Sequence, residues 1–157
     1  MEISDEDNCT SLFAKMGEAA LRLALRALPK FLNNELVGVP QDESLVTFSP
    51  SIKPEEEKID LSSGVKMAFG KIRALSDVPG AYLFINGEKL KVFKSFIISN
   101  EVHGEVNTVV SADKRGLYIQ LNDGVLSLLE VQKEGKKRMD YKSFLNGSPN
   151  LVGSKVE

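Results

Sequence analysis

The stretch that decides the fold is AYLFINGEKLKVFKSFII, residues 81–98. Two runs of strand-forming residues flank Asn86-Gly87, the dipeptide that most strongly favours a two-residue β-turn because both positions tolerate a positive φ. After the turn, side chains alternate so that Lys89 and Lys91 share one face, which is the period of a strand. The stretch therefore predicts a β-hairpin with strands at 81–85 and 90–98.

Further short runs of strand-forming residues follow the hairpin and are separated by turns that contain glycine. They lie at 104–111, 117–121 and 125–131. Five short strands in about 50 residues favour a small open barrel of the five-stranded OB type. A final helix is expected at about 141–145, where Asp140 can cap its start and Asn146-Gly147 can end it.

A helix with an unusually wide apolar face is expected before this β-rich part, over residues 11–32. Its apolar side chains form two adjacent stripes: Leu12, Met16, Ala20, Leu23 and Ala27, and beside them Leu21, Leu25, Leu28 and Leu32. A lone surface helix does not carry so wide an apolar face. Residues 1–4 fit the end of a strand. The face could be covered by the β-rich module, by another chain, or by a part of the domain outside this sequence, and we favour the last.

A proline-rich stretch joins the two parts. Residues 38–60 contain three prolines, which disfavour helix and cannot donate to a strand ladder, so an extended linker is expected. A second helix follows at about 62–75, with Asp60 or Ser62 as its cap. The predicted fold is α+β and mainly β, with the divisions 1–38 (strand and helix), 39–60 (linker) and 61–157 (OB-like domain).

Composition excludes several classes of protein. The chain has 157 residues, of which 42% are hydrophobic and 27% charged, as in ordinary globular domains. No apolar run reaches the roughly 20 residues of a membrane span, and the acidic start lacks the pattern of a secretory signal. The single cysteine, Cys9, rules out an intrachain disulfide. We therefore expect a cytoplasmic protein with no membrane partner.

Candidate catalytic or metal-binding residues are few. His103 is the only histidine and lies in an expected turn, and Cys9 lies among acidic residues that would oppose its ionisation. One histidine and one cysteine cannot assemble a zinc site of the common types. The contiguous acids at 55–57 suit a solvated linker, and no glycine-rich phosphate loop is present. We expect no catalytic residues, no metal site and no bound cofactor in this chain.

Basic residues gather in the second part of the chain. Residues 1–60 carry 12 acidic and 6 basic side chains, whereas residues 61–157 carry 10 acidic and 14 basic ones. The basic residues near expected turns and edges are Lys89, Lys91, Lys94, Lys114, Arg115, Lys133, Lys136, Lys137 and Arg138. A small barrel with cations at its loops can hold a nucleic-acid backbone. On composition alone, a merely solvated surface remains the more frequent explanation.

Several quoted stretches resemble the C-terminal half of methionyl-tRNA formyltransferases. They are PQDESLVTFSPSIKPEEEKIDL (40–61), IRAL with PGAYLFINGEKLKVFKS (72–95), and LNDGVLSLLEVQKEGKKRMDYKSFLNG (121–147); residues 12–28 resemble the last helix of the family's catalytic domain. The resemblance covers nearly all of residues 3–155. Leu61 and Val78 depart from the aromatic residues usual in the family at these positions.

The resemblance implies a function as well as a fold. The family transfers a formyl group from 10-formyltetrahydrofolate to the amino group of initiator methionyl-tRNA, and its C-terminal barrel presents a positive face to the tRNA. The resemblance thus implies that the nine basic residues bind tRNA. The catalytic and folate-binding residues of the family belong to a Rossmann-like N-terminal domain with no counterpart here, so this chain alone should be inactive and bind no cofactor.

Two other interpretations of the resemblance stay open. The chain could be a free-standing module that binds tRNA or protein, working in trans with a separately encoded catalytic domain. It could also be the C-terminal domain of a different folate-dependent formyltransferase.

Overall fold

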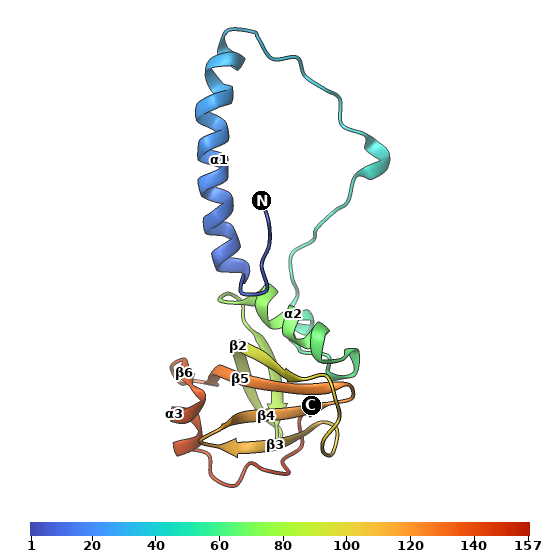
Figure 1. Ribbon diagram of the computed structural model, residues 1–157, viewed down its shortest axis with the longest axis vertical. Helices are drawn as coiled ribbons and strands as arrows, with labels where there is room; N and C mark the ends of the chain where they lie inside the picture. The colour runs from blue at the N-terminus through green and yellow to red at the C-terminus, as the bar shows by residue number, and fades with distance from the viewer. The chain divides into compact units, whose positions relative to one another are not determined.

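The computed structural model describes all residues, 1–157, and divides into two compact units, Met1–Ile52 and Lys53–Glu157. The first unit contains the helix α1 (Cys9–Leu32) and a short 3₁₀ helix, η1 (Glu43–Leu45). Residues 1–4 form no strand, because the unit offers no neighbouring strand to pair with them. The predicted helix at 11–32 is confirmed, two residues longer at its start (Figure 1).

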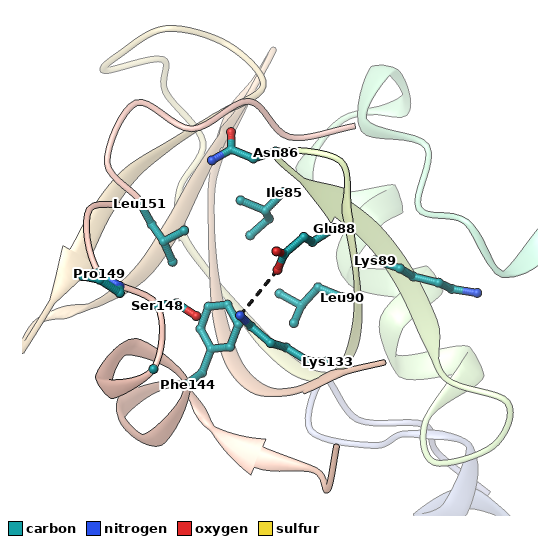
Figure 2. A pocket seen from close by; sticks show the side chains of 11 residues that line it. Ile85, Asn86, Glu88, Lys89, Leu90, Lys133, Phe144, Ser148, Pro149 and Leu151 are labelled. Atoms are coloured by element: carbon teal, nitrogen blue, oxygen red, sulfur yellow. Dashed lines mark ion pairs between the residues drawn. The ribbon is translucent and has the colours of Figure 1, made fainter. Parts of the chain in front are cut away.

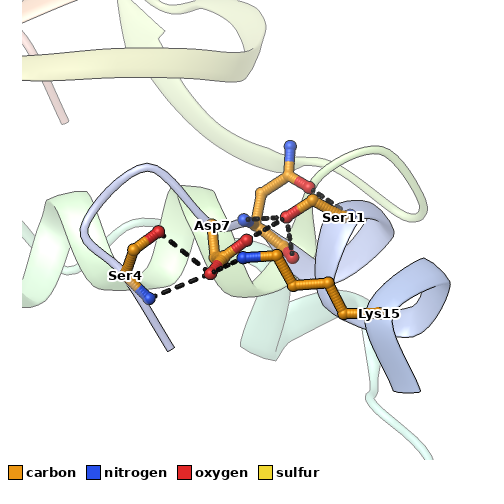
Figure 3. A network of polar contacts seen from close by, with 5 residues as sticks. Ser4, Asp7, Ser11 and Lys15 are labelled. Atoms are coloured by element: carbon orange, nitrogen blue, oxygen red, sulfur yellow. Dashed lines mark hydrogen bonds and ion pairs between the residues drawn. The ribbon is translucent and has the colours of Figure 1, made fainter. Parts of the chain in front are cut away.

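A dense polar network fixes the start of α1 (Figure 3). Asn8 and Ser11 form a reciprocal capping box, in which the Ser11 N–H donates to Asn8 Oδ1 at 2.9 Å. The Asp7 carboxylate accepts from Ser11 Oγ at 2.8 Å and pairs with Lys15 Nζ at 2.7 Å. The hydrogen bond from Lys15, with others from Ser4 and Ser11, holds the pKa of Asp7 far below its ordinary value. No side chain of α1 is buried within the Met1–Ile52 unit, although the helix carries many large apolar residues.

The second unit is built on one antiparallel sheet (Figure 1). Its strands are β1 (Ala81–Ile85), β2 (Glu88–Ser99), β3 (Thr108–Asp113), β4 (Gly116–Leu121), β5 (Gly124–Lys133) and the short β6 (Met139–Asp140). The order in the sheet is β1-β2-β5-β4-β3, and β6 pairs with β5. The helices of this unit are η2 (Pro54–Glu57), η3 (Leu61–Ser63), α2 (Val65–Leu75) and α3 (Tyr141–Asn146). The predicted α+β, mainly β fold is confirmed.

The hairpin predicted from Asn86-Gly87 is present. Both turn residues have positive φ, 51° and 79°, and Ile85 pairs with Glu88 across the turn. The second strand begins two residues earlier than expected, because residues 88 and 89 continue the ladder with β1. The long strand β2 then pairs with β5, and irregularities in their register let the sheet curve.

The strand expected at 104–111 starts only at Thr108. The preceding loop is held by Gln120, a fully buried side chain of β4 whose Oε1 accepts from the His103 N–H at 2.9 Å. The Gln120 amide nitrogen donates to the carbonyl oxygens of Leu121 and Gly124 at 2.8 and 2.9 Å. These bonds tie the loop to the β4–β5 turn. Asn107 donates its N–H to the Gln120 carbonyl oxygen at 2.7 Å but has a φ of 58°, so the extended strand begins only after it.

One continuous hydrophobic core joins the sheet to the helices of the second unit. The buried face of α2 consists of Val65, Ala68, Ile72 and Leu75, and Phe144 of α3 is buried in the same cluster. The cap of α2 differs from the prediction, because Asp60 caps the preceding η3 instead. The N–H of Val65 is bound by Asp123 Oδ1 at 2.7 Å, from the β4–β5 turn.

The strands form an open sheet, with β1 and β3 at its two edges. Residues 153–157 hydrogen-bond to both edges: the Phe84 N–H donates to the Glu157 carbonyl oxygen at 2.7 Å, and the Val109 N–H to the Ser154 carbonyl oxygen at 2.9 Å. Val156 makes a bridge to Ile85 and is buried. The five predicted strands are all present, joined by a sixth short strand, β6, and together they form an open sheet that is not closed into a barrel.

Candidate nucleic-acid interface

Three of the predicted basic residues converge on one hollow of the second unit. Lys91 lies opposite Gln132 in the β2–β5 register, and Leu90 lies opposite Lys133, which brings the start of β2 beside the end of β5. Lys89, Lys91 and Lys133 line a hollow of about 230 Å³ together with Gln132, Glu134 and Gly135. The sequence could place Lys89 and Lys91 on one face, but only the pairing of β2 with β5 adds Lys133.

Each lysine of this hollow is oriented by a neighbour. Lys89 Nζ lies 3.9 Å from the centroid of the Tyr82 ring, and Lys91 Nζ donates to the Pro79 carbonyl oxygen at 2.7 Å. Lys133 Nζ is 3.4 Å from a carboxylate oxygen of Glu88. Glu134 also lines the hollow and Glu88 pairs with Lys133, so the three lysines leave this region with a small net positive charge.

The loop that follows β5 presents two further cations. The Lys136 N–H donates to the Lys133 carbonyl oxygen at 3.1 Å, and Gln132 Nε2 donates to the Lys136 carbonyl oxygen at 2.7 Å. Gly135 has a φ of 69°, which the turn requires and which glycine adopts without strain. Lys136 and Lys137 are exposed and make no ion pair, so their charges face solvent on a loop whose backbone is fixed.

Arg138, the next residue, is held differently from its neighbours. Its guanidinium pairs with both Asp77 and Glu130 and lies 4.4 Å from the centroid of the Phe93 ring. Burial acts to lower the pKa of Arg138, but the hydrogen bonds that the guanidinium donates to the two carboxylates outweigh it, and the net pKa is raised. Arg138 thus anchors the loop to β2 and β5, with its side chain only 35% exposed. Sequence reasoning missed both acidic partners.

The remaining predicted cations lie outside this cluster. Lys94 is exposed on β2 opposite Glu130, and Lys114 and Arg115 form the β3–β4 turn. Arg115 is paired with Asp113 at 2.7 Å, and the Lys114 carbonyl oxygen accepts from the Tyr141 hydroxyl at 3.4 Å. The structure therefore brings together six of the nine predicted residues. We call these six the basic cluster: Lys89, Lys91, Lys133, Lys136, Lys137 and Arg138.

The polar groups around His103 do not have the geometry of a catalytic triad. The Ser99 hydroxyl lies 3.1 Å from His103 Nε2, and the Glu101 carboxylate approaches the same nitrogen at 3.8 Å. In a triad the nucleophile and the acid contact opposite nitrogens of the imidazole, so that the acid orients the base. No group of three or more His, Cys, Asp and Glu side chains could hold a metal ion. No helix combines the length and hydropathy that a membrane span requires.

Comparisons with known proteins agree with the predicted resemblance. Residues 51–149 match the family model "Formyl transferase, C-terminal domain". The chain is 40% identical to the methionyl-tRNA formyltransferase of Levilactobacillus brevis over 98% of its own length and 50% of the relative's. It is 39% identical to that of Streptococcus pneumoniae (strain Hungary19A-6) over 92% and 46%. The chain thus spans about half the length of the curated relatives that it matches.

Solved structures with the same fold include HypX from Aquifex aeolicus. One variant superposes with a TM-score of 0.71 over 92% of this chain and 27% of HypX, at 19% identity. A second variant gives 0.74 over 94% and 26%, at 18% identity. At such low identity the likeness concerns the fold. The sequence matches support a C-terminal portion of methionyl-tRNA formyltransferase, and the chain belongs to the formyl transferase C-terminal domain family.

Proposed function

We propose that this chain supplies the tRNA-facing C-terminal part of a methionyl-tRNA formyltransferase in the cytoplasm. The enzyme as a whole would move a formyl group from 10-formyltetrahydrofolate to the amino group of initiator methionyl-tRNA. The observation that carries the proposal is the basic cluster, which sets three lysines around one hollow and Lys136 and Lys137 on the loop beside it, with Arg138 anchoring that loop. Family membership supplies the substrate class.

The cluster suits a phosphate backbone better than exposed bases. The aromatic rings near the cluster already make cation–π contacts within the protein: Tyr82 with Lys89, and Phe93 with Arg138. Stacking on a base would require free aromatic faces, whereas phosphate contacts need only flexible cations, such as Lys136 and Lys137. We therefore infer electrostatic binding with little reading of sequence. Lys94, Lys114 and Arg115 extend this proposed surface at a distance from the hollow.

The first unit fits the same proposal. Within the Met1–Ile52 unit, helix α1 buries none of its apolar side chains. We infer that α1 is the last helix of a catalytic domain whose remaining part covers that face and holds the folate and the catalytic residues. The chain by itself then binds tRNA without formylating it.

Binding is tested by fluorescence anisotropy with labelled initiator tRNA at several salt concentrations. The double variant Lys136→Gln/Lys137→Gln should weaken binding and reduce the salt slope by about two, since each lost phosphate contact removes about one. Lys142→Gln, an exposed lysine of α3, is the control and should leave the slope unchanged. An unchanged slope in the double variant would contradict the role of the loop.

A second experiment separates an enzyme part from a free-standing binding module. The full chain is mixed with a separately produced N-terminal half from a related formyltransferase, and formylation of methionyl-tRNA is measured. Activity only in the mixture supports the proposed function. Activity of the chain alone would refute it, and tRNA binding without activity in the mixture would favour the module.

A further inference from the structure

A second pocket of the Lys53–Glu157 unit has the construction of a small-molecule site (Figure 2). It lies between the β1–β2 hairpin, the end of β5, α3 and the segment after α3, and its volume is about 250 Å³. Ile85, Leu90 and Phe144 are buried and form its apolar wall, and Leu151 adds a partly buried side chain. An apolar group of a ligand would gain dispersion contacts with this wall and would be removed from water there.

Ser148 gives the pocket an unused polar group. Its side chain lines the pocket and is only 8% exposed, yet its hydroxyl has no hydrogen-bond partner in the protein. A buried hydroxyl without a partner costs free energy, so one in the wall of a pocket calls for an explanation, and a bound ligand is one. Ser95 also has an unpartnered hydroxyl, but it lines neither pocket.

An ion pair, Glu88 with Lys133, also lines this pocket. Figure 2 shows Glu88 and Lys133 pointing toward each other, with their charged atoms 3.4 Å apart. Lys89 also borders the pocket, but Figure 2 shows its side chain directed away from it, and its Nζ lies over the Tyr82 ring, so Glu88 and Lys133 are the charged pair at the pocket. The Glu88 side chain is 76% exposed, so its carboxylate stays hydrated if the pair with Lys133 is broken. The Lys133 side chain is 33% exposed, and its Nζ also lies 5.3 Å from the centroid of the Phe144 ring. An incoming anion can therefore take Lys133 from Glu88 at little cost.

We propose that this pocket binds a small carboxylate with an apolar body of roughly six carbon atoms. The size follows from the volume, because a cavity of about 150 Å³ accommodates benzene and drug-sized ligands occupy about 300 Å³ or more. The apolar body packs on Leu90 and Phe144. One carboxylate oxygen accepts from the Ser148 hydroxyl, and the other pairs with Lys133. The site shares Lys133 with the basic cluster, but the proposal does not depend on tRNA binding.

The test is a titration of the ¹⁵N-labelled full chain with hexanoate, followed by the amide resonances in two-dimensional NMR. The amides of Asn86, Ser148 and Leu151 should shift together and saturate in the millimolar range. Hexanamide tests the charge and acetate tests the apolar body, and each should bind at least about tenfold more weakly. The amides of α1 report separately on any contact of hexanoate with that exposed helix.

Two variants test the polar contacts, and one serves as control. Ser148→Ala and Lys133→Gln should each weaken hexanoate binding about tenfold, because a hydrogen bond to a charged group is lost. Ser148→Ala should leave the melting temperature within about 2 °C, since its hydroxyl bonds nothing in the protein. Lys91→Gln, which lines only the neighbouring hollow, should bind hexanoate as the parent chain does.

The proposal is overturned by any of three results. These are the absence of saturable shifts at the pocket amides, equal affinity for hexanoate and hexanamide, and unchanged affinity in both Ser148→Ala and Lys133→Gln. Because no RNA is present, failure here leaves the proposed tRNA role untouched, and failure of tRNA binding leaves this pocket untouched.

Discussion

Asp123, in the β4–β5 turn, accepts the first backbone N–H of α2 from Val65, 58 residues earlier in the sequence. The residue before the helix, Gly64, has no side chain that could do this, and the neighbouring Asn122 donates its side-chain N–H to the Ser62 carbonyl oxygen at 3.0 Å. The turn of the sheet therefore performs the capping that most helices obtain from their own sequence. It also fixes where α2 starts above the core.

Replacing Asp123 should weaken the contact between the β4–β5 turn and the start of α2. Asp123→Ala should lower the free energy of unfolding by about 1 kcal/mol, the usual value of an N-cap hydrogen bond. Asp123→Asn keeps an acceptor oxygen and should lose less than half as much. Urea unfolding of both variants gives the comparison, and equal losses would show that charge, and not the hydrogen bond, stabilises the helix start.

Gly64 should resist replacement while Gly70 should not. Gly64 has φ 90° and ψ 168°, a region open only to glycine, and an added Cβ would lie 2.5 Å from Asp123 Oδ2. Gly64→Ala should therefore cost about 1–3 kcal/mol of stability. Gly70 lies inside α2 with free space around it, so Gly70→Ala should add about 0.5–1 kcal/mol. Thermal unfolding of the pair should give shifts of opposite sign.

Replacing Arg138 and replacing Lys137 should have different effects on stability and on tRNA binding, although the two cations are adjacent. Arg138→Gln removes two ion pairs and the contact with Phe93, and should destabilise the second unit by about 1 kcal/mol, given its partial exposure. Lys137→Gln should change stability by less than about 0.5 kcal/mol. In tRNA titrations the ranking should reverse, with Lys137→Gln having the larger effect on the salt slope. A larger slope change in Arg138→Gln would contradict this division.

Asp113 should titrate at unusually low pH. Hydrogen bonds from Arg115, first its side chain and then its backbone N–H, lower the pKa of Asp113 from 3.8 to about 2. A lowered carboxylate pKa stabilises the folded chain above the ordinary value, and this contribution is lost as the pH falls from about 4 through about 2. Carbon-13 NMR of the carboxyl group measures the value directly. In Arg115→Ala the pKa should rise toward 3.8 but stay below it, because the backbone N–H of residue 115 still donates to Asp113.

The ion pair of Asp113 with Arg115 also allows a test of whether the β3–β4 turn contacts tRNA. Asp113→Asn removes the charge that holds Arg115, so the guanidinium becomes free to meet a phosphate. If the turn contacts tRNA, the affinity at low salt should rise and the salt slope should steepen by about one. Asp140→Asn, which removes an acid at the start of α3 without freeing an arginine, controls for the simple change in net charge.

Local sequence signals accounted for the elements they control. Asn86-Gly87 predicted the hairpin, and Asp140 predicted the start of α3, where its carboxylate accepts from the Ser143 N–H at 2.7 Å. These signals work because a turn or a cap depends on residues within three or four positions. The proposed domain limits at 38 and 60 remain a prediction, and the structure divides into compact units at residue 52.

The contacts that shape the candidate site could not be predicted in the same way. Lys133 reaches the lysines of β2 only through a strand register that contains irregularities, and no local pattern fixes those. Arg138 finds Asp77 61 residues earlier in the chain, and this partner separates it from the free lysines beside it. The alternation of side chains along a strand showed which residues share a face. Which cations lie close together depends on how the strands pair in the folded sheet.

The attachment of residues 153–157 to both edges of the sheet has a consequence for biosynthesis. These residues follow every strand that they join, so they leave the ribosome after β1 and β3 have already emerged. Until then the amide of Phe84 and that of Val109 lack the acceptors that they have in the folded chain. Until residues 153–157 emerge, the two strand edges of the nascent domain are incompletely paired, and during this interval a chaperone would protect it best from association with other chains.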